Sequence, residues 1–219
     1  MVRPLLIVTL CVAAAILSLH GEDAATTPAP RIPRLPGSFA LEKRFTYKAA
    51  DHSKESQEVQ AAAEFLAMFP RPQTVDLEQT GAIRREKVRM TDGSRWEKWR
   101  AGQMRFSINE AAPDHVAVYA PGMDLYQAEN QGDFEELGWI KEAASAGEAV
   151  VGKQKCLVFR LGENVAWLDA DTGLPVVFES PTVKVTYTYK EPPAKALELP
   201  PRFQKRMEEV QNAWAGRPQ

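Results

Sequence analysis

Apolar residues recur at every second position through much of this chain, and this rhythm restricts the fold more than any other feature. In residues 183–190, Val183, Val185, Tyr187 and Tyr189 alternate with lysine and threonine. Such alternation puts the apolar side chains on one face of a β-strand. Shorter runs of the same kind lie at 75–77, 104–108, 116–118, 157–161 and 165–167, with glycine-containing turn signals between them. Short strands joined by tight turns predict an antiparallel sheet with one buried face.

Three segments with helical spacing are expected to cover that buried face. The first follows Ser53 or Ser56, either of which can cap it, and ends at Pro70. The second lies within 124–146, where one or two short helices are expected around Trp139, and the third begins at Pro200-Pro201. Their apolar residues are Val59, Ala62, Ala63, Leu66 and Phe69 in the first, Phe134, Leu137 and Ile140 in the second, and Phe203, Met207, Val210 and Trp214 in the third. The sequence therefore predicts an α+β fold, in which one curved antiparallel β-sheet carries N-terminal, middle and C-terminal helices on a single, concave face.

The N-terminus reads as an export signal. A short basic start precedes an uncharged apolar run from Leu5 to Leu19, which has the length of a signal-peptide core. We assign residues 1–24 to a signal peptide, with an uncleaved N-terminal anchor as the alternative, residues 25–37 to a proline-rich linker, and residues 38–215 to one domain. The protein is therefore expected to be exported, with the periplasm as its compartment.

Charge is balanced overall and uneven locally. The formal net charge is −2, so no strong field for nucleic acid is expected. Residues 83–105 hold eight lysines and arginines against three acids, whereas residues 124–142 hold six acids against Lys141. We interpret both stretches as solvated faces. The alternative is that the basic stretch makes peripheral contact with an anionic surface such as lipid head groups.

The candidate catalytic and metal-binding residues have simpler structural interpretations. The stretch Asp169-Ala-Asp-Thr-Gly173 has its glycine one position early for a calcium loop, and no closing glutamate follows at the required spacing. Asp and Gly are also what a hairpin turn requires, and we predict a turn. Cys156 is the only cysteine beyond the export signal, which leaves no intrachain disulfide, and nothing in the sequence brings His52 or His115 to it. We therefore predict no catalytic residue, no metal site, no cofactor and no enzyme activity.

Several segments resemble the periplasmic lipoprotein-carrier superfamily, the LolA- and LolB-like proteins, as an uncharacterised branch. The best match is the closing hairpin AWLDADTGLPVVFE, and the preceding strand GEAVVGKQKCLVFRL is next, within a likeness that runs from about Glu55 to Tyr189. The resemblance implies an incomplete β-barrel covered by helices, with acyl chains held between sheet and helices. The chain departs from a true carrier in lacking a lipobox and in its proline-rich linker and C-terminal helix, and no residue matches the carriers' functional arginine.

These observations lead to two hypotheses. The first is an exported, non-catalytic module that binds a lipid acyl chain or a lipoprotein between the sheet and its helices. The second is a cell-envelope sensor or protein-interaction domain on the same fold, with a filled core and no ligand. For the first, we predict head-group contacts at Arg100 and Arg105. The predicted acyl-chain contacts are Trp99, Phe106, Ile108, Phe159, Trp167, Val185 and Tyr187.

Overall fold

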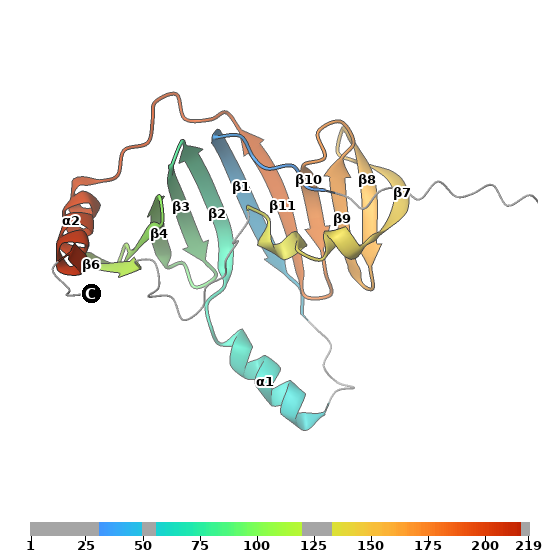
Figure 1. The fold of residues 1–219 in the computed structure, drawn as a ribbon. Coiled ribbons are helices and arrows are strands. Elements are labelled where there is room, and N and C mark those ends of the chain that lie inside the picture. The colour runs from blue at the N-terminus through green and yellow to red at the C-terminus, as the bar shows by residue number, and fades with distance from the viewer. Residues whose placement is uncertain (1–30, 50–55, 120–132, 216–219) are drawn as a thin grey trace, which may run out of the picture.

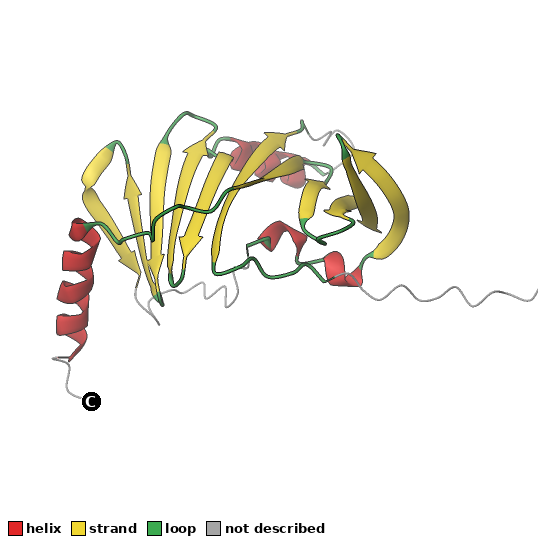
Figure 2. Ribbon diagram, turned by 90° about the horizontal axis from the view of Figure 1, so that it is seen from above, coloured by secondary structure: helices red, strands yellow, loops and turns green. Residues whose placement is uncertain are grey.

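The computed structural model describes residues 31–49, 56–119 and 133–215, and they form one open, curved antiparallel sheet of 11 strands (Figures 1 and 2). The strand order is β6-β5-β4-β3-β2-β1-β11-β10-β9-β8-β7. The strands are β1 (Ser38–Tyr47), β2 (Pro72–Thr80), β3 (Ile83–Met90), β4 (Arg95–Ala101), β5 (Met104–Asn109), β6 (Ala112–Tyr119), β7 (Ala144–Val151), β8 (Gln154–Leu161), β9 (Asn164–Asp169), β10 (Pro175–Glu179) and β11 (Val183–Lys190). The prediction of a single antiparallel sheet is confirmed. The predicted export signal and the first residues of the predicted linker lie outside the described residues.

Two meanders meet at the centre of the sheet. Strands β1–β6 run outward to one edge, β7–β11 return from the other edge, and β1 pairs with β11 with Phe45 opposite Val185. The alternating runs predicted from the sequence leave out several strands, among them β3, β4 and, at the centre of the sheet, β1. The buried residues Phe39 and Leu41 of β1 do alternate, but Lys43 continues the same face and breaks the apolar pattern.

The pairing register separates the side chains of this sheet into two faces. Directly opposite residues of an antiparallel pair point to the same side. Leu41 pairs with Leu77, which pairs with Glu86, and these residues define what we call the η face. Trp99 pairs with Phe106 and follows Lys98, the partner of Glu86. Trp99 and Phe106 therefore lie on the opposite side, which we call the α2 face.

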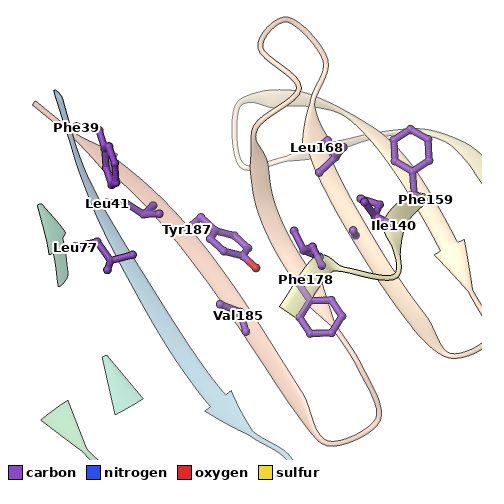
Figure 3. Close-up of a cluster of buried hydrophobic side chains, with 11 residues drawn as sticks. Phe39, Leu41, Leu77, Ile140, Phe159, Leu168, Phe178, Val185 and Tyr187 are labelled. Atoms are coloured by element: carbon purple, nitrogen blue, oxygen red, sulfur yellow. The ribbon is translucent and has the colours of Figure 1, made fainter. Parts of the chain in front are cut away.

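The larger core lies on the η face under two short 3₁₀ turns. The turns η1 (Glu135–Leu137) and η2 (Ile140–Glu142) belong to a segment, residues 134–142, that we call the roof. Leu137 and Ile140 of the roof are buried. Figure 3 shows Ile140 together with the strand side chains of this cluster. Those strand side chains are Phe39, Leu41, Leu77, Phe159, Ala166, Leu168, Phe178, Val185 and Tyr187.

A second core lies on the α2 face, beneath the C-terminal helix. Helix α2 (Pro201–Ala215) places Phe203 at ring-centroid distances of 6.3 Å from Trp99 and 5.3 Å from Phe106. Met207 and Val210 of the predicted stripe pack against the same cluster, and the side chain of Trp214 is outside the described part. The prediction that all helices cover one face is therefore wrong. The reason is that the apolar positions of β4 and β5 are one residue out of phase with the η face, and a one-residue shift moves a whole apolar set to the other side.

Helix α1 (Gln57–Ala67) contributes to neither core. Of the two predicted caps, Ser53 and Ser56, it is Ser56 that caps the helix, with its hydroxyl accepting a hydrogen bond from the Val59 amide at 3.4 Å. The expectation of a buried face is wrong, because the helix has no buried residue and extends from the end of the sheet below β1 and β2 (Figure 1). The proline-rich segment is in part attached to the domain, since Ile32 and Leu35 pack against the η-face core. Within the described ranges, no helix combines the length and apolarity needed to cross a membrane.

The two helices give a direct test of this division. We expect Phe203→Ala to lower the free energy of unfolding by about 3–5 kcal/mol, because Phe203 is fully buried against two aromatic rings. The same change at Phe65 of α1, which is 55% exposed, is expected to cost about 0.5 kcal/mol or less. Urea unfolding followed by circular dichroism measures both, and equal losses would contradict the described packing of α2.

Candidate functional site

One half-buried carboxylate fastens the roof to the sheet. Glu136 of η1 accepts hydrogen bonds from Lys43 Nζ of β1 at 3.0 and 3.1 Å, one to each carboxylate oxygen. The Tyr187 hydroxyl of β11 donates to Glu136 Oε1 at 2.6 Å. The two central strands of the sheet therefore both reach the same roof residue, and hydrogen bonds to a charged acceptor are stronger than neutral ones.

The surroundings of this carboxylate are largely apolar. Lys43 is 7% exposed, and its ammonium lies 5.6 Å from the ring centroid of Phe134 and 5.9 Å from that of Tyr187. Burial raises the pKa of Tyr187 well above its ordinary value, and the charge of Glu136 adds to this effect. The raised pKa keeps the Tyr187 phenol neutral near pH 7, so the hydroxyl donates its hydrogen bond to Glu136.

The acidic and basic stretches of the sequence meet at this site. Asp133, at the start of the roof, pairs with Arg84 of β3, and Arg84 Nε lies 3.0 Å from Glu86. The basic stretch itself is divided by strand alternation. Arg84, Lys98, Arg100 and Arg105 lie on the η face, whereas Arg85, Lys87, Arg89 and Arg95 lie on the α2 face. It is therefore not one continuous basic surface.

A pocket of about 390 Å³ opens on the η face beside the roof. Three arginines stand directly opposite one another on adjacent strands in its wall: Arg84 on β3, Arg100 on β4 and Arg105 on β5. Burial, and then the charge of Arg84, lower the pKa of Arg100. The other polar residues of the wall are Glu86, Lys98, Ser107, Tyr119 and Glu135.

The structure separates the residues that the sequence analysis grouped. Phe159, Val185 and Tyr187 meet in the η-face core. Arg100 and Arg105 line the neighbouring pocket, whose lining also includes Trp99 and Phe106 of the same two strands. Trp99, Phe106 and Ile108 pack under α2 on the opposite face, and Trp167 joins a small cluster with Cys156 and Val177 on that same face. The nine residues therefore do not line one cavity. Sequence reasoning missed Lys43 and Glu136, because only the fold shows that a lysine on an apolar strand face and a glutamate in an acidic stretch are partners.

The two features that raised the question of catalysis are structural. Asp169 Oδ1 accepts hydrogen bonds from the Thr172 hydroxyl and amide, each at 2.8 Å, and these bonds lower the pKa of its carboxyl. Gly173 follows with φ of 70°, so the stretch forms the predicted hairpin turn between β9 and β10. Cys156 is fully buried, and burial raises the pKa of its thiol, which disfavours the nucleophilic thiolate.

Neither metal-ligand clusters nor similarity to known proteins assigns a function to this chain. Across residues 31–49, 56–119 and 133–215, no group of three or more His, Cys, Asp or Glu side chains could hold a metal ion. Comparison of the chain with protein-family models and with curated protein sequences finds no match.

The anchoring of the roof can be measured by a double-mutant cycle. We expect Lys43→Met and Glu136→Gln each to cost about 3 kcal/mol of unfolding free energy, because each leaves a buried polar partner behind. The double variant should cost less than their sum by at least about 1 kcal/mol.

The pair of Lys48 and Glu179 supplies the control, since it joins the same residue types at 39% and 32% side-chain exposure. The corresponding cycle, Lys48→Met with Glu179→Gln, should give a coupling below about 1 kcal/mol. A coupling in the roof pair no larger than that of the exposed pair would contradict the anchoring role of Glu136.

Proposed function

We propose that this chain is an exported, non-catalytic module that holds an acyl chain of a lipid or lipoprotein between the η face and the roof. The observation that carries this proposal is the construction of the roof. A short segment with two buried apolar side chains, Leu137 and Ile140, covers a much larger apolar surface contributed by the strands. A segment this short can leave the apolar η face and be replaced there by a ligand.

The free energies of replacing the roof by a ligand favour a ligand with a long acyl chain. Exposing Leu137 and Ile140 costs about 1.5–3 kcal/mol for each side chain. An acyl chain recovers about 0.8 kcal/mol for each methylene that it buries, so about eight buried methylenes offset the loss of both roof residues. The ligand side chains in this proposal are Phe159, Val185 and Tyr187, together with Leu41, Leu168 and Phe178 of the same cluster. Trp99, Phe106, Ile108 and Trp167 have no part in it, because they lie on the α2 face.

Three other features support the proposal. The open sheet and its curvature agree with the incomplete barrel that the resemblance to the lipoprotein-carrier superfamily implies (Figure 2). The segments that carry the resemblance form the hairpin of β9 and β10 and strand β8, which supply Phe159, Leu168 and Phe178 to the apolar floor. The export signal predicted for residues 1–24 agrees with a module in the periplasm, where acyl chains must cross an aqueous space.

Weakening the roof should speed acyl binding. Tyr187→Phe keeps the ring but removes the hydroxyl that donates to Glu136, a bond to a charged group that is worth about 1.5 kcal/mol or more. We expect the variant to take up a fluorescent fatty acid about tenfold faster than the wild type in stopped-flow measurements.

Tyr189→Phe is the matched control, because the hydroxyl of Tyr189 donates to the Pro175 carbonyl at 2.8 Å and has no bond to the roof. Its uptake rate should equal that of the wild type. If none of the three proteins takes up the probe while circular dichroism shows all of them folded, the acyl-binding proposal is wrong.

A second candidate function is a cell-envelope interaction or sensor domain with a filled core. The packing of Leu137 and Ile140 into the η-face core favours it, and so does helix α1. Phe65, Leu66, Met68 and Phe69 at the end of this helix are between 53% and 72% exposed. Exposed apolar side chains gathered in this way are typical of interaction sites.

Helix α1 separates the two candidates. In this second function, Leu66→Ser with Phe69→Ser abolishes capture of a protein from envelope extract, whereas Ala61→Ser with Ala67→Ser, on the same helix, leaves capture intact. Quantitative mass spectrometry of the captured proteins measures both. Capture of the same protein by both double variants would exclude α1 as the contact.

A further inference from the structure

The three arginines of the η-face pocket stand in an electrostatically unfavourable row. Arg84 is directly opposite Arg100, and Arg100 is directly opposite Arg105, on three neighbouring strands. Directly opposite residues have Cβ atoms about 5 Å apart, and like charges in this arrangement repel. A row of three cations in a hollow therefore requires nearby negative charge, from the protein or from a ligand.

The protein supplies part of that charge, and the central arginine of the row is the one to examine. Arg84 is paired with Glu86 and with Asp133. Arg100, at the centre of the row, is half-buried, and no carboxylate of the described residues lies within ion-pair distance of it. Glu135 of η1 lines the pocket as well and adds a carboxylate to its wall. Arg100 is thus a cation at the centre of the row that makes no ion pair with the described residues.

The remaining groups of the pocket match an oxyanion. The Ser107 hydroxyl and the Tyr119 phenol add neutral donors to the guanidinium groups and to Lys98. Arginine forks bind phosphate oxygens in pairs, which makes them the preferred side chains for this group. A volume of about 390 Å³ falls within the range of small-molecule sites, and it exceeds what a bare phosphate fills.

From this geometry we propose that the pocket binds a phosphate-bearing head group, so that the ligand of the module is an anionic amphiphile. The evidence for the anionic part of the ligand is the pocket alone, whereas the acyl part of the ligand depends on the proposed function above. The two regions are continuous, because Glu86 of the pocket pairs directly with Leu77 of the apolar floor. The change from apolar to cationic surface therefore falls between β2 and β3, which gives a head group and its chain adjacent places on one face.

Two soluble probes distinguish the sources of the phosphate. Glycerol phosphate carries the head group alone, and dihexanoyl phosphatidic acid adds two short acyl chains. We expect both to bind in titration calorimetry, with affinity that falls as salt is raised. Tighter binding of phosphatidic acid supports a lipid source, and equal binding supports a free phosphate ester, but either result supports the phosphate site. Binding of neither probe overturns it.

Arg100→Gln is the decisive variant. We expect it to weaken binding of both probes at least about tenfold, because it removes the charge at the centre of the row. It should not lower the melting temperature of the free protein, because it also removes repulsion from two neighbours. Arg95→Gln is the matched control on the same strand, since Arg95 points to the α2 face and its side chain is 62% exposed. Unchanged binding by Arg100→Gln, or an equal loss in both variants, would overturn the proposal.

The outcomes keep this inference separate from the acyl-binding function. Phosphate binding that depends on Arg100, with no fatty-acid uptake by wild type or by Tyr187→Phe, supports the phosphate site and defeats the acyl function. Fatty-acid uptake without any binding of the phosphate probes defeats the phosphate site and leaves the acyl function in place.

Discussion

The contact of Glu136 with Lys43 and Tyr187 is the interaction on which the arrangement of the η face depends. A sheet with a large apolar face must cover it, and here a segment containing only two short 3₁₀ turns does so. Short turns of this kind have little stability of their own. A carboxylate held by an ammonium and a phenol fixes their position, and Leu137 and Ile140 then fill the space beneath. In the proposed function, the same contact is the point at which the roof is released.

The second organising feature is that the apolar face of the sheet changes from one side to the other between its two halves. Around β1 and β11 the apolar side is the η face, whereas in β4 and β5 it is the α2 face. Helix α2 therefore packs on the opposite side from the roof, and the η face of β3–β5 is left to charged residues. This change of side is what places a cationic pocket next to an apolar floor on one continuous surface.

Sequence patterns predicted the antiparallel sheet, the hairpin turn at Asp169, the Ser56 cap and the apolar stripe of α2. They did not predict which helix covers which face. The strands that carry Trp99 and Phe106 have alternation like that of Val185 and Tyr187. Alternation shows only which residues of one strand share a face. Whether two strands share an apolar side depends on register between segments far apart in the chain. For the same reason the acidic and basic stretches were visible as sequences, but their pairing through Asp133 and Arg84 was not.

The sequence alone determined part of the local structure: the most regular strands, the turns between them and the two α-helices, since these depend on propensities and spacing within a few residues. Only the tertiary structure decided that Lys43 is buried against Glu136, that three arginines stand in a row, and that α1 has no buried side. These features arise from pairings such as β1 with β11, whose residues are more than a hundred positions apart. Such contacts depend on the register of the whole sheet, which no short stretch of sequence encodes.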